Sequence, residues 1–120
     1  MTTKELLKKY RNYRDLKNYF DRKLALQWRL GIDASIGELA VRDRYAELVS
    51  QIERAINCVT DPTEQLLLRL RYIDGWSWTK ISFAIHYSLA QTKRIHEKAL
   101  KHLELYGSWT KPGWTEEDPT

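Results

Sequence analysis

The most informative stretch of the chain covers residues 78–103 and reads WTKISFAIHYSLAQTKRIHEKALKHL. Apolar side chains recur at helical spacing on either side of His86–Tyr87, which predicts a short helix over residues 78–85, a turn, and a longer helix over residues 88–106. The side chains that should face inward are those of Ile81, Ser82, Ile85, Tyr87, Thr92, Ile95, Ala99 and Leu103. Two helices joined in this way make a helix-turn-helix, whose second helix can enter the major groove of DNA.

The outer face of the second helix is basic. The residues left outside the predicted interface are Leu89, Ala90, Lys93, Arg94, Glu97, Lys98 and Lys101. Residues early in such a helix reach base edges, and longer basic side chains reach bases or phosphates. The start of the first helix, at residues 78–80, is where that helix crosses the DNA backbone. At the N-terminus of the second helix, free backbone N–H groups can bind a phosphate. The predicted DNA-binding residues are Trp78, Thr79, Lys80, Ser88, Leu89, Ala90, Gln91, Lys93, Arg94, Glu97, Lys98 and Lys101.

A family resemblance lies in residues 71–81 (RYIDGWSWTKI), in Tyr87–Ser88 and in residues 94–100 (RIHEKAL). Together they resemble the C-terminal part of phage late transcriptional regulators of the ArpU and RinA type. Those proteins are similar in turn to region four of bacterial sigma factors, the domain that reads a promoter element. The resemblance covers residues 61–103, and it implies a DNA-binding regulator or activator of transcription that is encoded by a phage or prophage.

The chain departs from this family pattern in three ways. His86 stands where many such turns have glycine, and Thr92 replaces a β-branched apolar residue. Leu89 and Ala90 occupy positions where polar base-reading residues are often found. Contact with thymine methyl groups is the base recognition open to these two apolar side chains.

Two long amphipathic helices are predicted before this region. The first runs from about residue 3 to residue 30 and stops at Gly31, and the second covers about residues 36–59. Asn18 and its neighbours are weak helix formers, which leaves an internal break open. The apolar stripes are Leu6, Tyr10, Tyr13, Leu16, Phe20, Leu24 and Trp28 in the first helix, and Leu39, Tyr45, Leu48, Val49, Ile52, Ala55, Ile56 and Val59 in the second. Such helices pack as an antiparallel pair or take part in a homodimer, and the sequence leaves both open.

A third helix is predicted to begin at Asp61–Pro62 and to end near Asp74–Gly75. Asp61 can cap it, Pro62 suits its first position, and Glu64 is favourable near the positive end of the helix dipole. Other helix starts carry Ser77 and the capping boxes Thr2 with Glu5, Ser35 with Glu38, and Ser88 with Gln91.

These elements predict an all-α fold, with long N-terminal helices followed by a C-terminal three-helix domain that contains the helix-turn-helix. Residues 1–60 form a helical region for oligomerisation or polymerase contact, and residues 61–106 form the sigma-region-four-like domain. Residues 107–120 form a flexible tail. Its Trp109 and Trp114 are expected to dock on the body of the chain or on a partner such as polymerase.

Composition fits a small cytoplasmic protein. The chain has 120 residues, of which 42% are hydrophobic, and no apolar run approaches the roughly 20 residues that span a bilayer. A net charge of +4 and a pI near 9.2 permit nucleic-acid binding without requiring it. The lone Cys58 fits a reducing compartment, and we expect it to be a buried small hydrophobe. The basic excess over residues 4–23 is interpreted as a solvated helix face.

No catalytic, metal or cofactor site is predicted. The histidines, His86, His96 and His102, lack ligand spacing on one helix face and have no cysteine pair beside them. No glycine-rich phosphate loop or nucleophile signature occurs. His96 is expected to flank the helix interface, and at least one of Trp76 and Trp78 is expected to close a small core.

The leading hypothesis is a sequence-specific regulator of transcription that binds double-stranded DNA through residues 88–101 in the cytoplasm of a bacterial host. Two alternatives stay open. One is a phage packaging protein of the small-terminase kind, which also joins a helix-turn-helix to helical oligomerisation segments. The other is a module that binds bacterial RNA polymerase or another protein.

Overall fold

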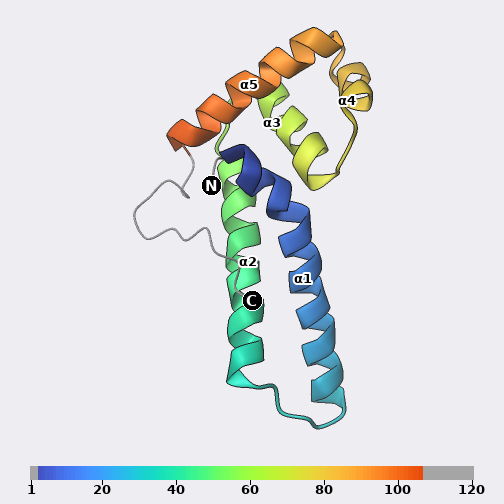
Figure 1. Ribbon diagram of the computed structural model, residues 1–120, viewed down its shortest axis with the longest axis vertical. Helices are drawn as coiled ribbons and strands as arrows, with labels where there is room; N and C mark the ends of the chain where they lie inside the picture. The colour runs from blue at the N-terminus through green and yellow to red at the C-terminus, as the bar shows by residue number, and fades with distance from the viewer. Residues whose placement is uncertain (1–2, 107–120) are drawn as a thin grey trace.

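The computed structural model describes residues 3–106, which form an all-helical fold, as the sequence predicted (Figure 1). The elements are α1 (Thr3–Arg29), α2 (Ile36–Asn57), α3 (Pro62–Leu68), the π-helical segment η1 (Arg69–Ile73), α4 (Trp78–Ile85) and α5 (Leu89–Tyr106). Among these residues there is no strand, and no helix has the length and apolarity needed to cross a membrane. Thr2 of the first capping box, and the tail with Trp109 and Trp114, lie outside the described residues.

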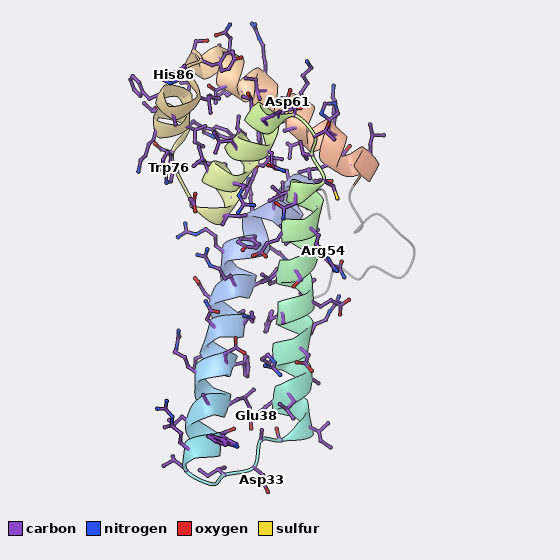
Figure 2. All side chains as sticks on the ribbon, turned by 180° about the vertical axis from the view of Figure 1, so that it is seen from behind. Asp33, Glu38, Arg54, Asp61, Trp76 and His86 are labelled. Carbon is purple, nitrogen blue, oxygen red and sulfur yellow. The ribbon has the colours of Figure 1, made fainter. Side chains whose placement is uncertain are left out.

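Helices α1 and α2 run antiparallel and side by side along the longest axis of the molecule, which measures 54 Å (Figures 1 and 2). Helix α1 passes through Asn18 without a break and ends before Gly31, whose φ of +72° suits glycine. Ser35 begins α2 by accepting a hydrogen bond from the Glu38 N–H at 3.0 Å. Of the two arrangements left open, the structure therefore contains the intramolecular pair.

The main core lies at one end of this hairpin, where α3, η1 and α5 cover it (Figure 1). Its buried side chains are Leu6, Leu7, Tyr10, Tyr13, Tyr45, Leu48, Val49, Ile52, Ala55, Ile56, Val59, Leu68, Tyr72, Ala99 and Leu103. The Tyr10 hydroxyl also donates a hydrogen bond to Glu53 and so joins α1 to α2. Residues on both sides of Thr60 therefore share one hydrophobic core.

The predicted apolar stripe of α1 is correct near this core and wrong at the far end of the hairpin. Leu16 and Phe20 are partly buried and still pack against the core, whereas Trp28 at the far end is 83% exposed. Among the helices that the structure describes, no third one reaches the far end, so a side chain away from the direct line between α1 and α2 is not covered there (Figure 1). An ion pair between Lys23 and Glu38, at 3.4 Å, joins the two helices there.

Helix α3 begins as predicted. The Asp61 carboxylate accepts hydrogen bonds from the N–H groups of Thr63, at 2.9 Å, and Glu64, at 3.1 Å, and Pro62 is the first helical residue. The Glu64 side chain is buried, and its carboxylate lies 2.8 Å from Nδ1 of His102 on α5. The start of α3 is thereby fixed to the last turns of α5.

The predicted third helix widens into the π-helical segment η1 before it ends. The N–H of Asp74 donates to the Arg69 carbonyl, five residues back, at 3.0 Å. This wider turn directs Tyr72 into the main core and Leu70 into a second cluster. The second cluster consists of Leu67, Leu70, Ile81 and Ile85, with Trp76, Trp78 and Ile95 packed around it. One short segment thus serves both clusters.

Cys58 is exposed, so the expectation that it is a buried hydrophobe was wrong. The residue is the C-cap of α2, and its N–H donates to the carbonyls of Arg54 and Ala55. Its backbone therefore belongs to the helix end, where the thiol side chain faces solvent beyond the core.

Candidate nucleic-acid interface

Helices α4 and α5 meet at a corner with the bounds that the sequence predicted, and Figure 2 labels His86 there. Ser77 begins α4 by accepting a hydrogen bond from the Lys80 N–H at 3.3 Å. His86 adopts the left-handed conformation, with φ 62° and ψ 39°, and the Tyr87 N–H donates to the Ser82 carbonyl at 3.2 Å. Histidine is among the few residues besides glycine that adopt this conformation with some frequency, so His86 can stand in for the usual glycine.

The start of α5 is held by the capping box that the sequence predicted. The Ser88 hydroxyl accepts from the Gln91 N–H at 3.2 Å, and the Ser88 N–H donates to Oε1 of Gln91 at 3.2 Å. The Thr92 hydroxyl donates to the Ser88 carbonyl at 2.8 Å, which satisfies this polar group inside the interface. A threonine is therefore accommodated where the family pattern has an apolar residue.

Ser88→Ala is expected to lower the free energy of unfolding by about 1 kcal/mol, because an N-cap hydrogen bond is lost. Urea denaturation followed by circular dichroism measures the change. Ser50→Ala is the matched control, since Ser50 is exposed inside α2, where alanine is the better helix former. Equal losses in the two variants would contradict a capping role for Ser88.

The inner faces of the corner pack as predicted with one exception. The buried residues are Ile81, Ser82, Ile85, Thr92, Ala99 and Leu103, and Ile95 is half-buried. Tyr87 was expected to face inward and is 45% exposed. Trp76 and Trp78 pack against the cluster in its place, so the prediction that an indole closes a small core is confirmed.

The outer face of the corner is open to solvent. Eleven of the twelve predicted DNA-binding residues are exposed, namely Thr79, Lys80, Ser88, Leu89, Ala90, Gln91, Lys93, Arg94, Glu97, Lys98 and Lys101. Trp78 is the half-buried exception, and its ring lies 4.6 Å from the Arg71 guanidinium and 4.6 Å from the His96 ring. The structure therefore places Trp78 against the core side of α5, apart from the other eleven.

The basic residues of this face have no neutralising partner within residues 3–106. Lys93, Arg94, Lys98 and Lys101 form no ion pair with another described residue. The Lys80 ammonium lies 4.1 Å from the centroid of the Trp76 ring, which holds it at the start of α4 by a cation–π contact. The charge of the face is available to an anionic partner.

His96 is a further residue whose burial differs from the sequence-based expectation. It was expected to flank the interface and is only 3% exposed, and its Nε2 shares a 2.6 Å hydrogen bond with the Tyr72 hydroxyl. Burial lowers the pKa of His96 to about 4. Its position four residues after Thr92 and three before Ala99, both inward-facing, was the sequence signal for burial.

Within residues 3–106, no group of three or more histidine, cysteine, aspartate and glutamate side chains could hold a metal ion. Comparison with protein-family models, with curated proteins and with solved structures found no match to this chain. Its function is therefore inferred from its own residues.

Proposed function

We propose that this chain is a sequence-specific DNA-binding regulator of transcription whose α4–α5 corner is a helix-turn-helix. The observation that carries the proposal is the exposed, unpaired basic face of α5, opposite an inner face locked into the core. Residues 61–106 then act as the reading domain, and residues 1–60 support it or contact RNA polymerase or a second copy. The resemblance to ArpU- and RinA-type regulators supports a phage or prophage origin and action at a bacterial promoter.

In this proposal, the first turns of α5 enter the major groove and recognise the bases. Leu89 and Ala90 are exposed there and suit thymine methyl groups. Gln91 has already committed its Oε1 to Ser88, so only its amide N–H groups are free to donate to a base acceptor. Gln91 in this rotamer selects acceptor atoms such as a purine N7 over donor groups.

In this proposal, most of the binding affinity comes from the basic side chains. Lys93, Arg94, Lys98 and Lys101 supply contacts to phosphates and bases along α5, and Lys80 supplies one where α4 crosses the backbone. Each neutralised phosphate releases a counterion, so binding weakens as salt rises.

Arg94→Ala with Lys98→Ala is expected to weaken binding to duplex DNA about tenfold or more and to flatten the salt dependence by about one to two units in log–log slope. The duplex is obtained by selection from a random-sequence pool with the wild-type protein. Fluorescence anisotropy over a series of salt concentrations measures both quantities, and circular dichroism shows that the helices persist.

The control is Arg22→Ala with Arg54→Ala, which removes the same charge from exposed hairpin positions (Figure 2 labels Arg54). Its affinity should stay close to that of the wild type. Equal weakening in both double variants, or failure of the selection to enrich any duplex, would refute reading by α5.

A further inference from the structure

A cleft of about 330 Å³ lies where the first turns of α1 face η1 and the start of α4. The charged residues that line it are Lys4, Lys8, Arg11 and Arg71, and Gly75 and Trp78 form part of its wall. No acidic residue among residues 3–106 lines this space, which we call the basic cleft. The sequence interpretation of Lys4, Lys8 and Arg11 as an ordinary solvated face did not anticipate a concave site.

Three of these cations have no partner among the residues that the structure describes. Lys4, Lys8 and Arg11 form no hydrogen bond or ion pair through their side chains within residues 3–106. Farther along α1, by contrast, Lys17 pairs with Asp21 at 3.2 Å. Like charges one helical turn apart repel, so this arrangement lowers the stability of the helix. A bound anion would offset the repulsion.

The wall opposite α1 is fixed by contacts of its own. Arg71 donates from Nη1 to the Trp76 carbonyl at 3.0 Å, and its guanidinium lies over the Trp78 ring. Arg14 donates to the Ile73 carbonyl at 3.2 Å and so ties α1 to the end of η1. The basic cleft is therefore preformed by helix packing.

Glycine at position 75 makes room for one of the cations. Gly75 has φ +75°, and a Cβ added there would meet Nη1 of Arg11. Glycine suits this backbone conformation and leaves room for the guanidinium as it stands.

Three of these charges also act on a buried group, His96. They reach the buried imidazole of His96, where Lys4, Arg71 and Lys8 each lower the pKa, in addition to the larger effect of burial. A concave surface lined by one sign of charge focuses its potential and raises the local concentration of counter-ions.

We propose that the basic cleft binds phosphate groups. Two guanidinium and two ammonium groups line this space, with no carboxylate among its described lining residues, and the guanidinium fork matches phosphate oxygens. Trp78 is already in contact with Arg71 and His96, so recognition falls to the cations and not to base stacking. The phosphates come from the backbone of bound DNA or from a free polyphosphate, and only the first source rests on the proposed function.

The first arm of the test titrates pyrophosphate into isotope-labelled full-length protein and follows amide shifts by nuclear magnetic resonance. Saturable shifts centred on Gly75 and the first turns of α1 are expected. Lys4→Gln with Lys8→Gln should weaken this binding about tenfold or more, because two charge-assisted contacts are lost. The charge-matched control, Arg22→Gln with Arg54→Gln, should bind as the wild type does.

The second arm measures the same variants against the selected duplex DNA. A weaker affinity and a salt slope reduced by about one to two in Lys4→Gln with Lys8→Gln would assign the cleft to DNA phosphates. Unchanged duplex affinity beside weakened pyrophosphate binding would assign it to a free phosphate ligand.

Absence of saturable pyrophosphate shifts at the cleft, together with unchanged duplex affinity, would overturn the proposal, as would equal losses in the control. If the chain binds no duplex at all, the proposed function fails, and the pyrophosphate titration still decides the cleft. Thermal unfolding of each variant verifies that the exposed substitutions leave the fold intact.

Discussion

Leu68→Ala is expected to lower the free energy of unfolding by about 2–5 kcal/mol, the range for a fully buried leucine. Leu68 has no exposed surface, and its cluster draws side chains from α1, α2, η1 and α5 as well as from α3. Each of these elements is held by the others, so the cavity has little freedom to collapse. Against a total stability of about 5–15 kcal/mol, this loss is large.

Leu66→Ala on the same helix is the matched control. Leu66 is 44% exposed, so its truncation should cost about 1 kcal/mol or less. Urea denaturation of both variants, followed by circular dichroism and by tryptophan fluorescence, measures the difference. Because residues before and after Thr60 share the core, the two probes should report one transition in each variant. Similar losses in the two variants would show that the core is not centred on Leu68.

Acidification is expected to destabilise the protein through His96. The pKa of this imidazole is about 4 in the folded protein against 6.5 for an unperturbed histidine. Between these values the unfolded chain binds more protons, so stability present above about pH 6.5 is lost as the pH falls toward 4. A protonated His96 would be buried near Lys4, Lys8 and Arg71, and Glu97 acts in the opposite direction.

The expected loss is about 2–3 kcal/mol between about pH 7 and pH 4.5. Urea denaturation at a series of pH values measures it. His96→Gln should flatten the profile, because the group that titrates is gone. His86→Asn is the control, since it removes an exposed histidine from a left-handed position that asparagine tolerates. A His96→Gln profile as steep as that of the wild type would contradict this origin of the pH dependence.

Helix boundaries were predictable because local chemistry sets them. Ser35, Asp61, Ser77 and Ser88 each accept a backbone hydrogen bond within three residues, so the sequence contains both partners of every cap. The π-helical end of the third helix was not predicted. It depends on Leu70 and Tyr72 serving two clusters formed by distant parts of the chain.

Burial was predictable only where the partner surface could be inferred. Periodicity showed which side of α1 is apolar, but not that the covering helices stop short of Trp28. Tyr87 and Cys58 stand at helix ends, where spacing along a helix no longer indicates direction. His96 fits the buried spacing but was expected to flank the interface, because its hydrogen-bond partner Tyr72 lies 24 residues earlier in the chain.

The candidate interface and the basic cleft differ in how much sequence could reveal. The exposed face of α5 follows from one helix and its spacing, so the eight predicted residues that lie on α5 could be placed outside from the sequence alone. The cleft requires Lys4 and Lys8 to meet Arg71, which lies beyond the whole hairpin in sequence. No local pattern connects those positions.

The two ends of the α1–α2 hairpin differ in how many other helices pack against them. Near Ile52 and Ile56 its amide hydrogens lie beneath the shared core and should exchange with solvent only when the whole protein unfolds. Around Trp28 and Ile36, both largely exposed, the backbone is protected by one neighbouring helix and can open by itself. The far end of the hairpin can therefore unfold and refold locally while the α4–α5 corner stays folded.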